Sequence, residues 1–167
     1  MNTRTGMPGV FAFTLWVLLL LGASSLQAVY AARLAFWGGY PDFPLTVALC
    51  AALLSDASVG CVTGFGAGLV MASVCGRTLG TFLISRTIAG YLAGLLTNRL
   101  FRGNLGVVFL GVWGASVAAE VIYGLAAPRL TLMHWVYSTL IGATMNAFLA
   151  LPITLLLRRF GWGQGRV

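Results

Sequence analysis

The sequence has few charged residues and no lysine. Only 8% of its 167 residues are charged, whereas soluble domains carry about 25%. The polar stretches between its apolar segments are too short to form a soluble domain of their own. These shortages exclude a soluble catalytic or nucleic-acid-binding domain. The 59% hydrophobic content instead predicts an integral membrane protein.

Residues that carry chemistry are also scarce. The chain has one histidine and three cysteines, and it contains no CxxC pair, no carboxylates paired on a helix face and no phosphate-binding glycine loop. Cys50, Cys61 and Cys75 lie in apolar surroundings, so we interpret them as small buried hydrophobic residues. His134 is interpreted as an interfacial anchor. We therefore expect no enzyme activity, no metal site and no cofactor.

The net charge of +7 comes from ten arginines, which stand one or two at a time between apolar runs. This scatter argues against nucleic-acid binding and in favour of a role in membrane topology. For a chain with six spans, six arginines fall on the side of the termini and three on the other side: Arg4, Arg99, Arg102, Arg158, Arg159 and Arg166 against Arg33, Arg77 and Arg129. The count predicts that both termini are cytoplasmic.

The apolar segments predict an all-α membrane protein with six transmembrane helices in one compact domain, residues 1–167. The helices are expected at about residues 10–32, 43–55, 59–74, 78–97, 105–127 and 131–157. The second is too short to span alone, so we expect other helices to shield it from lipid. A cleaved signal peptide is the alternative interpretation of the first apolar run.

Small residues recur at helical spacing in three of these segments. They are Gly60, Gly64, Gly68 and Ala72 in the third, Gly90 and Gly94 in the fourth, and Ala28 and Ala32 in the first. Small residues let membrane helices approach closely. We expect these positions to form helix-packing or partner surfaces.

Polar residues within a span are costly and need partners. Arg86 and Glu120 lie at similar depth on helices expected to be antiparallel, and Asn146 is predicted to join them. The favoured interpretation is a structural clamp in which Arg86 pairs with Glu120. The alternative is contact with a ligand, a proton or a partner.

Four features resemble the rod shape-determining protein MreD family. They are the loop Tyr40-Pro41-Asp42-Phe43, the glycines at 60, 64 and 68 leading to Leu79-Gly80, the run 89–94 followed by the basic segment 98–102, and Asn146 with Pro152 before Arg158-Arg159. Glu120 resembles the acidic position of the family's fifth segment. The sequence departs from the family at Ala72, where an aspartate is frequent.

The resemblance implies a non-enzymatic scaffold of the cell-elongation complex in the bacterial inner membrane. It implies pairing with MreC and, through MreC, a link to MreB and to the glycan polymerase and transpeptidase of lateral wall synthesis. It also implies a fold similar to the substrate-binding subunits of energy-coupling-factor vitamin transporters. Such a subunit is the alternative function, against which the outward loops offer few polar groups beyond Asp42, Arg77 and His134.

Overall fold

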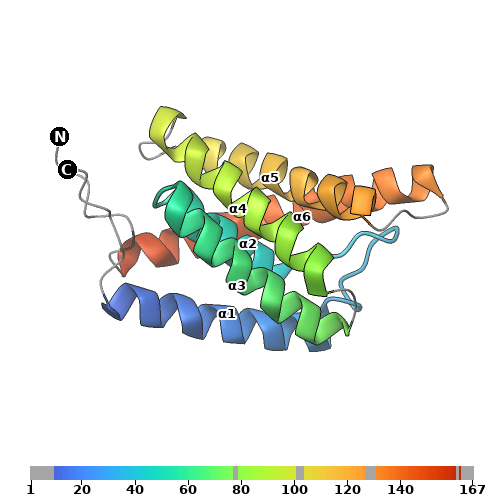
Figure 1. The fold of residues 1–167 in the computed structure, drawn as a ribbon, viewed down its shortest axis with the longest axis horizontal. Coiled ribbons are helices and arrows are strands. Elements are labelled where there is room, and N and C mark those ends of the chain that lie inside the picture. Colours follow the sequence, from blue (N-terminus) through green and yellow to red (C-terminus); the bar gives the residue numbers. More distant parts are fainter. Residues whose placement is uncertain (1–9, 77–78, 101–103, 127–130, 161, 163–167) are drawn as a thin grey trace.

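The computed structural model describes residues 10–76, 79–100, 104–126, 131–160 and 162, and its statements concern these residues. Six helices follow one another along the chain (Figure 1). They are α1 (Val10–Tyr30), α2 (Phe43–Leu53), α3 (Ala57–Cys75), α4 (Leu79–Leu100), α5 (Leu105–Ala126) and α6 (Leu132–Arg159). Each helix begins and ends within three residues of its expected bounds, and the all-α prediction is confirmed. The arginines at 4, 77, 102, 129 and 166 lie outside the described residues.

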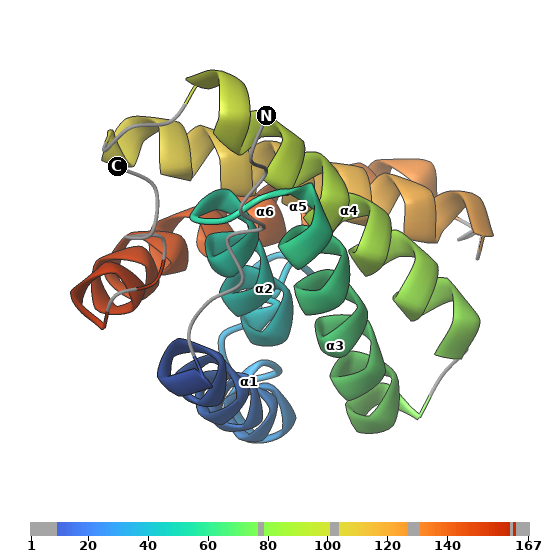
Figure 2. The same ribbon diagram turned by 60° about the vertical axis from the view of Figure 1, so that its left-hand side comes forward.

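Helix α2 is the buried centre of the bundle. All of its 11 residues are buried, and it contacts each of the other five helices (Figure 2). The other five are long and apolar enough to cross a membrane. The prediction that protein shields the short second helix is confirmed, and the chain is a multi-pass membrane protein.

Side chains fix both ends of α2. At its start, Asp42 Oδ1 accepts a hydrogen bond from the backbone N–H of Leu45 (2.9 Å), an N-cap that satisfies one of the free donors of the first turn. Near its end, the indole N–H of Trp162 donates to the carbonyl of Ala51 (3.1 Å) and to Ser55 Oγ (2.9 Å). Trp162 is only 1% exposed, so this residue from beyond α6 belongs to the core.

The glycine lines of α3 and α4 face each other. A Cβ at Gly60 would overlap the carbonyl oxygen of Gly90, and a Cβ at Gly64 would overlap that of Arg86. A Cβ at Gly68 would lie 2.9 Å from the carbonyl oxygen of Phe82, and one at Gly94 would overlap the carbonyl of Asp56. These glycines therefore serve helix packing within the chain. Helix packing is one of the two roles expected for these positions, and the α3–α4 contact occupies the glycines.

The small residues of α1 are placed differently. Ala28 on α1 is exposed, and so is Ala32, which lies in the turn after α1 because the helix ends at Tyr30, two residues earlier than expected. Gly22 on α1 has no atom within 4 Å of a Cβ built on it. Helix α1 packs mainly against α2 and α3 at one edge of the bundle (Figure 1). It is also the least buried of the five candidate spans. An open small-residue surface therefore remains on α1.

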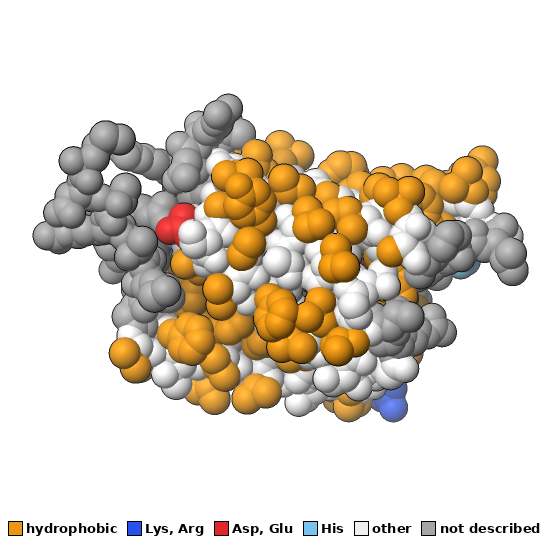
Figure 3. Space-filling view, viewed as in Figure 1, with side chains coloured by type: hydrophobic (Ala, Val, Ile, Leu, Met, Phe, Trp, Pro, Cys, Tyr) orange, Lys and Arg blue, Asp and Glu red, His pale blue; other side chains and the backbone are white. Residues whose placement is uncertain are grey.

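The surface agrees with a membrane location. In Figure 3, hydrophobic side chains spread over the described part of the visible face, and the charged side chains seen there lie at its upper left and lower right. Apolar side chains in lipid and charged ones near the headgroups are the expected distribution for a membrane protein.

Candidate functional site

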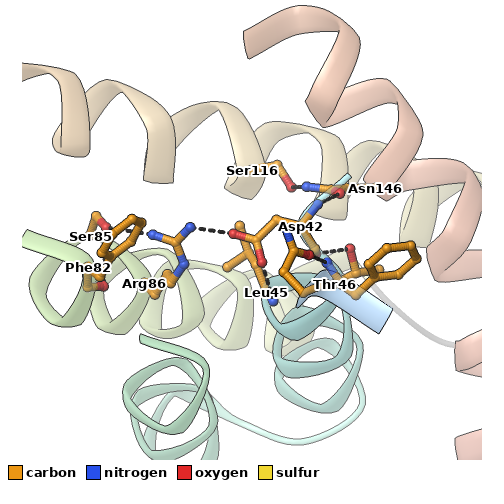
Figure 4. Close-up of polar contacts among 10 residues, drawn as sticks. Asp42, Leu45, Thr46, Phe82, Ser85, Arg86, Ser116 and Asn146 are labelled. Carbon is orange, nitrogen blue, oxygen red and sulfur yellow. Dashed lines mark hydrogen bonds and ion pairs between the residues drawn. The ribbon is translucent and has the colours of Figure 1, made fainter. Parts of the chain in front are cut away.

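Asp42 organises a buried polar cluster at the start of α2. Asp42 is 6% exposed, and its side-chain and backbone atoms bond to three helices of the bundle (Figure 4). While Oδ1 caps α2, Oδ2 forms an ion pair with Arg86 Nη2 of α4. The Asp42 carbonyl accepts from the Thr46 hydroxyl (2.8 Å) and the Thr46 backbone N–H (3.0 Å). The preceding Pro41 is also buried. The predicted loop motif is thus an interior anchor.

Arg86 is 1% exposed and reaches Asp42 from α4. Its guanidinium lies over the Phe82 ring, 4.4 Å from the centroid, where a cation is attracted to the π face. Its Nη1 donates weakly to Ser85 Oγ (3.4 Å). The Nε–H has no hydrogen-bond partner. The ion pair removes the net charge of the guanidinium but leaves donor capacity unused.

Asn146 of α6 completes the cluster. Its Oδ1 accepts from the backbone N–H of Asp42 (2.8 Å), and its Nδ2 donates to Ser116 Oγ of α5 (3.2 Å). On the other side of the loop, Gln27 Oε1 of α1 accepts from the backbone N–H of Phe43 (2.9 Å). The loop before α2 is therefore tied by side chains to α1, α4 and α6, and through Asn146 to α5.

The structure brings together the three residues predicted as a polar layer but changes the pairing. Arg86, Glu120 and Asn146 line one cavity, whereas the ion pair described for Arg86 is with Asp42. The structure therefore corrects the predicted pairing of Arg86 with Glu120 to a pairing of Arg86 with Asp42. The error came from treating Asp42 as a loop residue, because its position before a short helix hid its depth. Gln27 and Ser116 were missed, although a lone amide in an apolar run is a usable signal.

The cavity beside the cluster has a volume of about 450 Å³. It lies between the C-terminal parts of α3 and α5, the N-terminal halves of α4 and α6, and the loop before α2. Polar residues from all of these elements except α3 contribute to its lining: Tyr40, Asp42, Arg86, Ser116, Glu120, Tyr123, Ser138, Thr139 and Asn146. The sequence argument considered only the loops, whereas helices supply most of these polar groups.

The structure changes the interpretation of two residues at this cavity. Cys75 is exposed and lines the cavity, so it is not the buried hydrophobic residue that was expected. Ala72 is 5% exposed and lies in a cluster with Met71, Phe82 and Tyr123. The aromatic rings of Phe82 and Tyr123 are 4.8 Å apart and form an apolar part of the cavity wall. Ala72 therefore leaves an apolar contact where a carboxylate is frequent in the family that the sequence resembles.

The described bonds of the Asp42 cluster hold parts of the bundle together. In the described part of the chain, no group of three or more His, Cys, Asp or Glu side chains could hold a metal ion. The polar atoms of the cluster mostly bond to one another and to backbone groups at the start of α2. Their clearest consequence is to fix the loop that joins α1 to α2.

Replacing Asn146 with alanine should destabilise the protein by about 1–3 kcal/mol, because the buried N–H of Asp42 would lose its acceptor. Ser116→Ala is the matched control: it removes the other hydrogen bond of Asn146 but leaves the Asp42 N–H satisfied, so its effect should be smaller. Thermal unfolding of the purified variants measures both. An equal or larger loss for Ser116→Ala would contradict this ranking.

Comparison with known proteins identifies the family of this chain. The sequence matches the family described as rod shape-determining protein MreD over residues 7–160. Neither the curated proteins nor the solved structures gave a match. The expected fold similarity to energy-coupling-factor subunits therefore stays a prediction. The match extends over almost the whole chain, including all six helices and the Asp42 cluster. The chain belongs to the MreD family, which supports a role in rod shape determination.

Proposed function

We propose that this protein is a non-enzymatic membrane scaffold of the bacterial cell-elongation complex and that it pairs with MreC. The family supports the role in cell shape, and the outer face of α1 supports pairing through a helix. Through MreC, the protein would connect to MreB and to the glycan polymerase and transpeptidase of lateral wall synthesis. The membrane would be the inner one, with both termini in the cytoplasm.

A difference between α1 and the α3–α4 pair supports the choice of α1 as the pairing surface. A single-span partner needs small residues at which its backbone can approach closely. The glycines of α3 and α4 already contact the opposite helix, whereas Gly22 on α1 meets no atom and Ala28 and Ala32 are exposed. Ser25, also exposed, lies between Gly22 and Ala28 on the helix. We define this small-residue face as Gly22, Ser25 and Ala28 of α1 together with Ala32 of the turn after it.

Leucine at Gly22 or Ala28 should reduce co-purification of tagged MreC at least fivefold, because the added side chains would hold the two helices apart. The chain itself should stay folded, since a Cβ at Gly22 meets no atom and Ala28 is exposed. Gly114→Leu on α5 is the matched control, because Gly114 is also exposed and has no atom within 4 Å of a built Cβ. Equal recovery of MreC with all three variants would rule out this face.

The cavity favours a second candidate, the substrate-binding subunit of an energy-coupling-factor vitamin transporter. Its polar lining supplies the converging groups that such a subunit needs. A thermal-shift screen with common vitamins distinguishes the two functions, because a bound ligand raises the melting temperature by mass action. Stabilisation by a vitamin, with no MreC recovered from cells, would favour the transporter subunit.

A further inference from the structure

We propose that residues 33–40, which we call the aromatic turn, form an anchor whose tip inserts into the headgroup layer of a phospholipid membrane. Figure 1 shows this segment at the end of the bundle where α1 ends and α6 begins. Contact with lipid requires no partner protein, so the inference goes beyond the proposed function and does not depend on it.

The length of α1 places the aromatic turn at the level of the headgroups. The 21 residues of α1 extend over roughly 30 Å at the helical rise, which is about the thickness of the hydrocarbon core of a bilayer. The helix ends at Tyr30, so the residues that follow it lie near the membrane surface. This layer is where Trp and Tyr are enriched in membrane proteins.

The tip of the turn has an unusual backbone conformation. Phe36 and Gly39 exchange two backbone hydrogen bonds (2.8 and 2.9 Å), and the two residues between them, Trp37 and Gly38, have φ angles of +48° and +80°. These features define a type I′ turn, in which Asn, Asp or Gly is the usual first central residue. Tryptophan is unfavourable in this left-handed region, so its retention there points to a role for the ring.

One side of the turn is packed and the other is open. A Cβ at Gly38 or Gly39 would lie only 2.6 or 2.8 Å from atoms of α6, so the two glycines hold the turn against that helix. The rings of Phe36 and Trp37 are instead 59% and 73% exposed. They stack on each other, with centroids 5.9 Å apart and planes inclined by 9°. The turn therefore presents a fixed pair of aromatic rings to its surroundings.

The charge next to the rings favours phospholipid as the occupant. An exposed apolar patch marks a contact with a membrane or with another protein. The segment 31–41 contains Arg33 and no acidic residue. Arg33 is exposed, and its guanidinium lies 5.9 Å from the centroid of the Tyr30 ring. An arginine at this depth pairs with lipid phosphates while the aromatic rings lie among the upper parts of the acyl chains.

Tryptophan fluorescence of the full chain in lipid nanodiscs, without a partner protein, tests this contact. Spectra of the wild type and of Trp37→Asn are recorded in phosphatidylcholine and in phosphatidylcholine with bromine atoms near the headgroup end of one acyl chain. A third pair of spectra is recorded with iodide in the surrounding water. The difference between the two proteins is the emission of Trp37. Bromine reports contact with lipid, and iodide reports access from water.

We expect the brominated lipid to quench the Trp37 emission about threefold more strongly than iodide, because the ring lies among lipid. A surface for a water-soluble domain would instead leave Trp37 open to iodide when no partner is present. The proposal is overturned if iodide quenches this emission at least as strongly as the brominated lipid does, or if neither quencher acts on it.

The chosen variant separates the ring from the fold. Asparagine followed by glycine is favoured in a type I′ turn, so Trp37→Asn should melt at or above the wild-type temperature. Trp37→Phe gives the same difference spectrum if the asparagine variant does not fold. Trp135→Phe is the matched control from α6, because the Trp135 ring packs close to Gly124 of α5. The brominated lipid should quench the Trp135 emission less than that of Trp37, and equal quenching would also overturn the proposal.

Discussion

Replacing Arg86 with methionine should lower the free energy of unfolding by about 3–5 kcal/mol, enough to deplete folded protein from the membrane. The physical reason is that Asp42 would remain as a buried carboxylate whose ion-pair partner is gone. Asp42 also caps α2 and sits where α1, α4 and α6 meet the loop. Thermal unfolding of purified protein and the folded fraction after membrane extraction both measure the loss.

Two further variants separate the ion pair from the bulk of the side chain. Asp42→Asn combined with Arg86→Met should recover part of the loss, because asparagine keeps the N-cap of α2 and carries no charge. Arg33→Met is the matched surface control and should change stability by less than about 0.5 kcal/mol, since Arg33 is exposed. Wild-type stability of Arg86→Met would show that the cluster does not hold the fold together.

Leucine at Gly64 should be at least as damaging, with an expected loss of about 3 kcal/mol or more. Even a Cβ at this position would overlap the carbonyl oxygen of Arg86, and backbone atoms cannot move aside as a flexible side chain can. The substitution would separate α3 from α4 and displace Arg86 from Asp42. Thermal unfolding and the monodispersity of the purified protein report the damage.

Gly114→Leu provides the comparison, because the same change is made at an exposed helical glycine with open space around it. Its melting temperature should stay at or slightly above the wild-type value, since glycine is a poor helix former. Similar stability of the Gly64 and Gly114 variants would mean that the α3–α4 contact is looser than the structure shows.

The helices could be predicted from the sequence because lipid imposes a simple rule on length and hydrophobicity. The short second segment was expected to be shielded, and its 11 buried residues confirm this expectation. The spacing of the glycines also predicted close helix packing. The spacing could not show which helix packs against each row of glycines. Small residues at helical spacing look the same whether they face another helix of the chain, a partner or lipid.

The polar cluster was only partly predictable. Arg86 and Asn146 stood out because polar residues within apolar runs need partners. Asp42 did not, since it lies in a segment with glycines and prolines that reads as a surface loop, and only the tertiary structure shows that this loop folds inward. The same limitation hid the cavity, whose lining comes from positions far apart in the sequence. Trp162 was missed because its contacts with Ala51 and Ser55 lie more than 100 residues away in the chain.

Site-specific photo-crosslinking in cells tests the pairing of α1 with MreC most directly. A photoreactive amino acid is placed at Ala28 on α1, or at the exposed control positions Leu110 on α5 and Phe148 on α6, which are 65% and 62% exposed. The scaffold account predicts that MreC is captured from position 28 and not from positions 110 or 148. Capture of MreC from either control position with none from position 28 would contradict it.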